Sequence, residues 1–422
     1  MQMFKEEIVI AGGGLGGLLS GAFLSKYNYK PLIIEETNEV GGRFRNLNYK
    51  GYTLSTGALH TIPHGDSGPL AKLIQNLDLN VKIINSKPRC GVFLIEDKYI
   101  PAERTLDIIK LSRNWTERIE MTKIFMKMIF STGHHENSFK DWFFENSDNE
   151  YIYNIFDTIC RFSIGTWGDR IEASGFHSLV KHVSWFGGSG IIKGGCSSVI
   201  RELEKYILSH GGKIEKKCSI KKIIVKGGIE KIVIEKSGKL DEIDCEYLIS
   251  NLGPHKTDVL LKGDNISKRN LEKWKPINGI KISISSRKRI FNHTGILWTV
   301  SAENISGIVE VTNADPSLAP KNKHLLIAYH ALDEKKNIEK QIENMKEELK
   351  RIIPDFNRNC EFLLTQIYHS NFPVNWAPHH SGIEPKIHIK NLYFVGDSIN
   401  TPYSMAERVA KSVETVIKDF KR

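Results

Sequence analysis

The sequence lacks any run of about 18 consecutive apolar residues, and this absence excludes a helix that crosses a membrane. Residues 1–7 are polar and lead directly into an apolar strand pattern, without the basic start and separate apolar stretch of a signal peptide. Of its 422 residues, 40% are hydrophobic and 26% are charged, as in ordinary globular proteins. We therefore expect a cytoplasmic protein of two or three domains.

Paired cysteines are also absent. None of the six cysteines stands in a Cys-x-x-Cys pair or at the spacing of a metal finger; they are Cys90, Cys160, Cys196, Cys218, Cys245 and Cys360. We expect buried, reduced thiols and no metal site.

Positive charge is in excess, but dense basic clusters are missing. The formal net charge is +10, yet no Arg/Lys cluster is interleaved with aromatic residues. This pattern argues against a nucleic-acid partner. A widely spread lysine excess and attraction to an anionic membrane surface both remain open.

The N-terminal segment has the pattern of a β-α-β unit. An apolar strand at residues 8–10 leads into a glycine-rich loop, a helix follows, and a second strand covers residues 31–35. The loop reads Gly12-Gly-Gly14-Leu15-Gly16-Gly17, a G-x-G-x-x-G motif between strand and helix. Its first glycine allows the tight turn, the second lets a pyrophosphate approach, and the third lets the helix pack closely. The helix N-terminus then faces the phosphates.

Glu35 ends the second strand, eighteen residues after Gly17, and Glu36 follows it. A carboxylate at this place accepts hydrogen bonds from ribose hydroxyls and repels a 2′-phosphate. No second G-x-G-x-x-G exists, so we expect no tight NAD(P)H site. The motif alone leaves NAD and FAD both open.

Gly41-Gly42-Arg43 follows at a short distance, and here the sequence resembles the FAD-dependent amine oxidase and phytoene desaturase superfamily. It is most similar to archaeal-type phytoene desaturase homologues. The resemblance implies non-covalently bound FAD, with the glycines near the flavin and Arg43 against the pyrophosphate and flavin region.

The resemblance extends along most of the chain. Gly396-Asp397, after the strand at residues 391–395, resembles the segment in which the Asp binds the ribityl chain. One departure is the bulky turn after Asp397, which replaces the family's Gly-rich turn. By resemblance, the remaining cofactor-binding residues are Thr56, Gly57, Ala58, Ile220, Asn251 and Met405.

The resemblance also implies the fold class: α/β, with a glutathione-reductase-like Rossmann FAD-binding domain that is discontinuous and interleaved with an α+β substrate domain. We expect the FAD-binding domain at residues 1–69, 186–260 and 360–422. The substrate domain would consist of a helical part, residues 70–185, and a sheet-and-helix part, residues 261–359. Strict alternation at residues 279–285 predicts a half-buried strand, and residues 408–420 the last helix.

His60 and His64 are the predicted catalytic residues. If residues 57–58 run past the flavin, as the resemblance implies, these imidazoles lie near the substrate, where they can give or take a proton. A core role for both remains open. Trp376, His379 and His380 are further candidates.

The resemblance implies an FAD-dependent oxidoreductase of the phytoene desaturase type. Its substrate would be a long-chain isoprenoid or prenyl lipid, oxidised by hydride transfer to the flavin. One alternative is a non-redox hydratase that adds water to a prenyl double bond of an ether lipid, with His60 as the acid. Another is a flavin amine oxidase. A binding module with a relic flavin is the non-enzymatic alternative.

An insoluble substrate would require contact with a membrane. Residues 115–130 form an apolar helical pattern carrying Lys123 and Lys127 one turn apart. This helix can lie on anionic lipids at the inner face of the membrane, cover the substrate cavity together with residues 139–144, or do both. The sequence indicates no oligomeric state.

Overall fold

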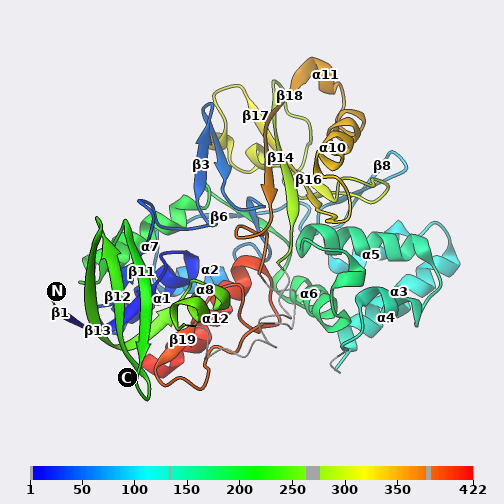
Figure 1. Cartoon of the computed structure of the whole chain (residues 1–422). Helices are drawn as coiled ribbons and strands as arrows, with labels where there is room; N and C mark the ends of the chain where they lie inside the picture. The colour runs from blue at the N-terminus through cyan, green and yellow to red at the C-terminus, as the bar shows by residue number, and fades with distance from the viewer. Residues whose placement is uncertain (1–2, 133–134, 263–275, 377–381, 422) are drawn as a thin grey trace.

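A computed structural model describes residues 3–132, 135–262, 276–376 and 382–421 (Figure 1). Its first large sheet has the strand order β10-β2-β1-β13-β12-β11, and β19 pairs with the C-terminal part of β13. Strands β10, β2, β1, β13 and β19 run parallel, whereas β11 and β12 are antiparallel neighbours. The bounds are β1 (Met3–Ala11), β2 (Leu32–Ile34), β10 (Lys213–Glu215), β11 (Cys218–Val225), β12 (Ile229–Lys236), β13 (Lys239–Ser250) and β19 (Leu392–Phe394).

This sheet and the helices that pack on it form the unit expected to bind FAD, which we call the FAD-binding unit. Helix α1 (Leu15–Lys26) lies at its centre. Its residues are apolar or small on every side, so it can be buried between α7 (Ser197–Ser209) and α12 (Met405–Ile417). Helix α2 (Pro69–Asn76) also packs on α12. Helix α8 (Pro254–Leu260) follows β13 in the sequence. The mixed α/β fold expected from the sequence is confirmed.

The second large sheet has the strand order β18-β14-β17-β16-β15-β7-β8 and belongs to the unit expected to hold the substrate, which we call the substrate unit. Helix α10 (Ile338–Ile352), followed by α11 (Phe356–Asn359), packs its apolar stripe into the core of this sheet. The bounds are β7 (Val92–Ile95), β8 (Lys98–Pro101), β14 (Gly279–Ser286), β15 (Leu297–Thr299), β16 (Gly307–Glu310), β17 (His324–Ala331) and β18 (Cys360–Tyr368).

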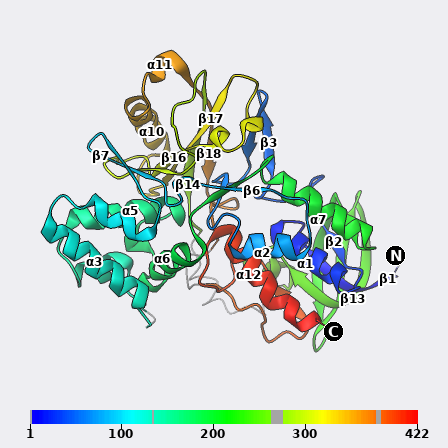
Figure 2. The same cartoon turned by 180° about the vertical axis from the view of Figure 1, so that it is seen from behind.

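A helical lobe extends from this sheet on the side away from the FAD-binding unit, as both views show (Figures 1 and 2). Among the described residues, no helix is long and apolar enough to cross a bilayer. The lobe consists of η1 (Thr105–Leu111), α3 (Trp115–Phe130), α4 (Phe139–Phe144), α5 (Glu150–Ser163) and α6 (Ala173–Phe186).

Short strands join the two units. Strands β3 (Asn46–Tyr49) and β4 (Tyr52–Ser55) form a hairpin. Strand β9 (Gly190–Ile192) lies between β5 (Thr61–Ile62) and β6 (Ile83–Asn85) in a small antiparallel sheet. The chain therefore returns to the junction several times.

The expected boundaries differ from the structure at several points. Helix α2 contributes to the core of the FAD-binding unit, so the boundary at residue 70 lies too early. Strand β18 pairs with β14 in the substrate sheet, so the boundary at residue 360 also lies too early. The part expected to be helical contains β6, β7 and β8. The last helix is α12, which begins three residues earlier than expected.

The strand predicted at residues 279–285 is confirmed as β14, but it is fully buried instead of half-buried, because every one of its residues is buried. Its isoleucines face the core beneath α10. The alternate polar residues face the β3–β4 hairpin instead of water, and there Ser285 shares a hydrogen bond with Tyr52. Alternation shows that the two faces differ in polarity, but it does not show that the polar face meets solvent.

Candidate FAD and substrate site

The glycine loop between β1 and α1 has the geometry of a phosphate-binding turn. Gly12 has a φ of +94°, which disfavours any residue with a Cβ atom. A Cβ at Gly17 would stand 2.1 Å from the Gly12 carbonyl oxygen, so only glycine allows this helix-to-strand approach. Helix α1 begins at Leu15 with Gly14 as its N-cap and without a side-chain cap or an acidic first turn. Its first backbone N–H groups can therefore face an anion.

Glu35 closes this loop from the end of β2. Its carboxylate accepts hydrogen bonds from the backbone N–H of Gly13 (2.9 Å) and from the N–H (2.9 Å) and hydroxyl (2.8 Å) of Thr37. A carboxylate offers about four acceptor positions, so three donors leave room for one more. Glu36 is exposed and forms an ion pair with Lys256 (2.6 Å), away from this contact.

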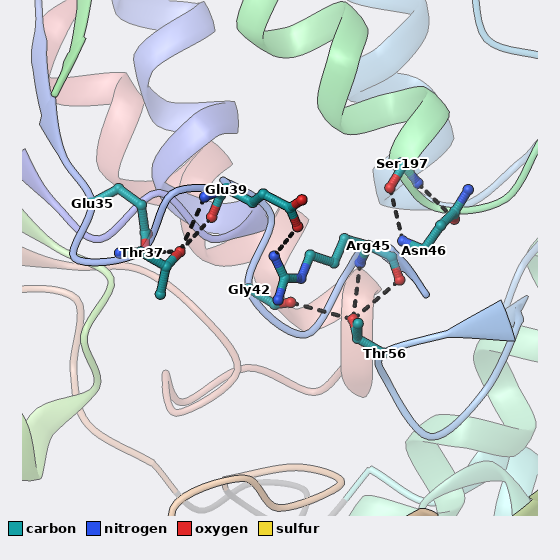
Figure 3. Close-up of polar contacts among 8 residues, drawn as sticks. All are labelled: Glu35, Thr37, Glu39, Gly42, Arg45, Asn46, Thr56 and Ser197. Carbon is teal, nitrogen blue, oxygen red and sulfur yellow. Dashed lines mark hydrogen bonds and ion pairs between the residues drawn. The ribbon is translucent and has the colours of Figure 1, made fainter. Parts of the chain in front are cut away.

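The Gly41–Gly42 turn lies against the glycine loop and is held by a polar network (Figure 3). The backbone N–H of Gly41 donates to the Gly13 carbonyl (2.7 Å). The Thr56 hydroxyl contacts the Gly42 carbonyl (3.3 Å), which joins this turn to the segment after β4. Farther along, Asn46 exchanges hydrogen bonds with Ser197 at the start of α7 (Figure 3).

Arg43 joins the two ends of the chain. Its guanidinium donates to both carboxylate oxygens of Asp397 (2.8 Å each) and to the backbone carbonyls of Pro373 and Val374 (3.1 Å each). Asp397 also accepts the Trp376 N–H (3.2 Å), which still leaves about one acceptor position. His379 and His380 lie outside the described residues.

Asn251 links the glycine loop to the C-terminal strand. Cβ atoms at Gly14 and Gly16 would each lie 2.5 Å from the Asn251 side-chain amide, and one at Gly396 would lie 3.2 Å from it. These expected cofactor residues therefore meet at one point. Ile220 lies in β11, whose first residue donates its N–H to the Glu35 carbonyl.

Residues 56–58 lie against the substrate sheet. Lys281 of β14 donates to the carbonyl (2.7 Å) and hydroxyl (3.0 Å) of Ser55 and to the Gly57 carbonyl (2.6 Å). Tyr368 of β18 donates to the Thr56 and Gly57 carbonyls (3.0 and 2.7 Å). Burial lowers the pKa of Lys281 to about 7, so its charge is partly lost at neutral pH.

Arg408 holds the unusual turn after Asp397. This fully buried guanidinium donates to the backbone carbonyls of Tyr403 (2.8 Å), Thr401 (3.1 Å) and Asp397 (3.5 Å). Burial lowers its pKa to about 10, which still leaves it charged. The turn expected to face the flavin is thereby fixed, and Met405 begins α12 behind it.

A largely apolar cavity lies between the helical lobe and the substrate sheet. Its volume is about 110 Å³, and about 920 Å³ when the open mouth and the gaps between the lining atoms are included. Met405 and Leu59, which adjoin the proposed cofactor segments, form part of its lining. Of the segments expected to line a tunnel, α3 contributes Phe125 and α4 contributes nothing. The other aromatic lining residues are Phe93, Phe156, Phe162 and Trp298.

His60 and His64 do not line this cavity. Leu59, Thr61 and Pro63 line it, whereas neither histidine is among its lining residues and both are buried. Burial, with a smaller effect of the Lys281 charge, lowers the pKa of His60 to about 3. Burial also lowers the pKa of His64 to about 4, although its Nδ1 contacts the Gly187 carbonyl (3.3 Å). The role of His60 and His64 in proton transfer stays a prediction. With these pKa values both imidazoles are neutral near pH 7, so they could accept a proton there but would rarely have one to donate.

Comparisons with known proteins agree with this geometry. The model of the NAD(P)-binding Rossmann-like domain family matches residues 10–77. The uncharacterized protein MJ1488 of Methanocaldococcus jannaschii is 34% identical over 391 residues, which cover 93% of each chain. The crystal structure of an oxidoreductase from Methanosarcina mazei is 30% identical and has a TM-score of 0.89, with 98% of this chain and 100% of that chain covered.

More distant relatives include the phytoene desaturase of Cercospora nicotianae, 22% identical over 58% of this chain and 45% of that protein. A structure of a putrescine oxidase mutant covers 99% of both chains with a TM-score of 0.76 and 16% identity. The chain belongs to the FAD-dependent amine oxidase and phytoene desaturase superfamily. The Methanosarcina mazei relative, at 30% identity, is itself described as an oxidoreductase.

The residues present fit the FAD of this superfamily. The uncapped start of α1, the glycine contacts and the spare acceptor positions on Glu35 and Asp397 supply what a pyrophosphate, a ribose and a ribityl chain require. Sequence reasoning missed Lys281, Tyr368 and Arg408. Lys281 could have been noticed as the single charge within an apolar strand, whereas nothing in the sequence marks the other two.

Proposed function

We propose that this oxidoreductase removes a hydride from a long-chain isoprenoid or prenyl lipid bound in the apolar cavity. The observation that carries the proposal is the position of Met405 and Leu59. Both line the cavity, and both directly adjoin segments assigned to the flavin, namely the turn after Asp397 and residues 56–58. A hydrocarbon chain in this cavity would therefore end beside the flavin.

The cavity residues act by binding and by excluding water. Phe125, Phe156, Phe162 and Trp298 offer apolar contact to a hydrocarbon chain and no group that would compete for a hydride. FAD, when bound, would supply the two-electron acceptor for the two hydrogens that the substrate loses. Arg408 and Arg43 fix the chain segments around the reacting position by their hydrogen bonds to backbone carbonyls.

The lining argues against amine oxidation as the alternative. No carboxylate is among the described residues that line the cavity, whereas Arg89 and Arg104 line it and are themselves exposed. A protonated amine entering there would find no carboxylate among these described lining residues to pair with. The low pKa of His60 argues against the hydratase alternative, because the alkene would have to take its proton from a group that is almost always neutral at pH 7.

The test is anaerobic incubation of the purified FAD-loaded protein with phytoene or a geranylgeranyl lipid in liposomes. We expect bleaching of the flavin absorbance and a product two hydrogens lighter. An unchanged flavin with a product heavier by one water would establish the hydratase instead. Bleaching by amines alone would establish an amine oxidase.

A cavity-filling variant tests where the substrate binds. Leu179 lines the cavity, so Leu179→Trp should reduce the rate of flavin bleaching at least about tenfold by occluding the chain. Leu208→Trp makes the same change at an exposed position of α7 and should leave the rate unchanged. Flavin absorbance checks that both variants retain FAD. Equal rates in the two variants would place the substrate elsewhere.

A further inference from the structure

Helix α3 has two apolar faces on opposite sides. The inner face carries Met121, Ile124 and Met128, which are buried, and Phe125, which also lines the cavity. The outer face carries Trp115, Ile119, Met126 and Phe130, with exposed fractions of 70%, 44%, 43% and 68%. Because these positions are separated by four, seven and four residues, they share one stripe along the helix.

Positive charge borders this outer stripe. Lys123 lies at the edge of the stripe, between Ile119 and Met126. Lys127 lies one turn farther along the helix, and its ammonium donates a hydrogen bond to the Asn146 side chain (2.6 Å). At the start of the helix the Arg118 guanidinium lies 5.7 Å from the centre of the Trp115 ring. The stripe is therefore an exposed apolar strip with cations on both sides.

The acidic residues of α3 do not offset this charge on the stripe. Glu117 is buried and paired with Arg113 (2.5 Å). Glu120 accepts hydrogen bonds from Ser147 and Asn149. On a helix, residues three or four positions apart share a face. Neither Glu117 nor Glu120 is at this spacing from any residue of the stripe, so both carboxylates lie on other faces of α3.

From these observations we propose that the outer stripe of α3, defined as Trp115, Ile119, Met126 and Phe130, docks on the surface of an anionic lipid bilayer. A helix with tryptophan and phenylalanine on one side and flanking Lys or Arg is suited to lie in the interfacial plane, where apolar burial and attraction to anionic headgroups act together. A protein partner would not require cations on both edges of the strip.

The position of α3 in the fold agrees with this surface. Both views place it in the lobe remote from the FAD-binding unit, where a planar surface can approach it (Figures 1 and 2). Its neighbour η1 exposes Leu106 beside Arg104 and Thr105 of the cavity lining. Thr105 in turn contacts Ser184 (2.9 Å), next to the exposed Trp185. Further exposed apolar side chains therefore lie near residues that line the cavity.

The proposal does not rest on the proposed reaction, because binding is measured without turnover. FAD-loaded protein is floated with vesicles of phosphatidylcholine, with and without phosphatidylglycerol. We expect binding that requires phosphatidylglycerol and weakens as salt is added. Trp115→Ser/Phe130→Ser should lower the partition coefficient at least about tenfold, and Lys123→Gln should lower it about fivefold.

The matched control is Leu240→Ser/Val259→Ser, which removes two similarly exposed apolar side chains from β13 and α8 of the FAD-binding unit. It should bind vesicles as the unmodified protein does. Absent binding, or equal binding by the two double variants, would overturn the proposal. So would a concentration-dependent dimer that Trp115→Ser/Phe130→Ser abolishes while vesicles remain unbound, because the stripe would then join two copies of this chain.

Discussion

The ammonium group of Lys281 is enclosed between two units of the protein, with its three donors directed at Ser55 and Gly57. Burial lowers its pKa from 10.5 to about 7. Between these values the unfolded chain binds a proton that the folded protein does not. The free energy of unfolding should therefore rise with pH across this window, by at most about 1.4 kcal/mol per unit.

Lys281→Met should remove this rise. Urea unfolding of both proteins at several pH values between 7 and 10 gives the two slopes. The unmodified protein should show the steeper increase, and the difference should be confined to this window. An identical slope in the variant would mean that the ammonium is solvated in the folded protein.

Glu407 predicts a pH effect of opposite sign. Burial raises its pKa from 4.5 to about 7, although it accepts the Leu70 N–H at the start of α2 (2.7 Å). The folded protein holds this proton more tightly than the unfolded chain. The corresponding stability is present below about pH 4.5 and is lost as the pH rises through 7, by about 3 kcal/mol in all.

Glu407→Gln keeps an acceptor for Leu70 and removes the titration. Relative to the unmodified protein, the variant should be more stable above pH 7 and similar below pH 4.5. Chemical unfolding at pH 4 and pH 8 measures the difference. A variant that is less stable at pH 8 would show that the ionised carboxylate is favoured in the fold.

At the scale of elements, the start of α12 depends on a side chain inside it. Arg408 holds the carbonyls of the turn after Asp397, and this turn is the one assigned to the flavin. Arg408→Met should leave these buried carbonyls without their donor and destabilise the protein by about 2–4 kcal/mol. It should also weaken FAD binding at least about tenfold.

Lys411→Met is the control for Arg408, because Lys411 lies on the same helix and makes a partly exposed ion pair with Glu414. Fluorescence titration of the apoproteins with FAD measures both affinities. We expect the control to bind FAD as the unmodified protein does, since such pairs contribute little. Equal FAD affinities of the Arg408→Met and Lys411→Met variants would show that the turn after Asp397 does not contribute to FAD binding.

The elements with strong local patterns were predictable. Periodicity at residues 115–130 gave α3 with its observed bounds, and the apolar stripe from Ile338 to Ile352 gave α10. For α3 the sequence left two roles open, covering the cavity and lying on lipid. The first agrees with the face that carries Phe125, which lines the cavity, and the second is proposed for the face that carries the exposed Phe130. Contacts distant in sequence left no such pattern. The pairing of β18 with β14 joins residues about 80 apart, so the boundary placed at residue 360 missed it.

In the candidate site, too, the residues of local motifs were predictable, whereas contacts between residues distant in sequence were not. The glycine loop, Glu35 and the Gly-Asp pair belong to local motifs, and the structure brings them together around Asn251. Lys281 and Tyr368 reach the Gly57 carbonyl from strands of the other unit, which no local motif encodes. The orientation of His60 depends on how the chain bends between β4 and β5, and composition does not specify that.

For the whole molecule, buried polar contacts join the substrate sheet to the FAD-binding unit through Lys281, Tyr368 and the Tyr52–Ser285 pair. Several chain crossings add to them. We therefore expect one cooperative unfolding transition. Far-UV circular dichroism and the fluorescence of released flavin should give the same midpoint in urea. Separate midpoints would show that the units unfold independently.

Strand β5 has a consequence for the evolution of this pocket. Its two residues point to opposite sides, since Thr61 lines the cavity whereas Ile62 packs in the core of the FAD-binding unit. Substitutions at Thr61 can therefore change the wall of the pocket without altering that core. The choice of substrate can diverge among descendants of this protein while the cofactor-binding fold is inherited unchanged.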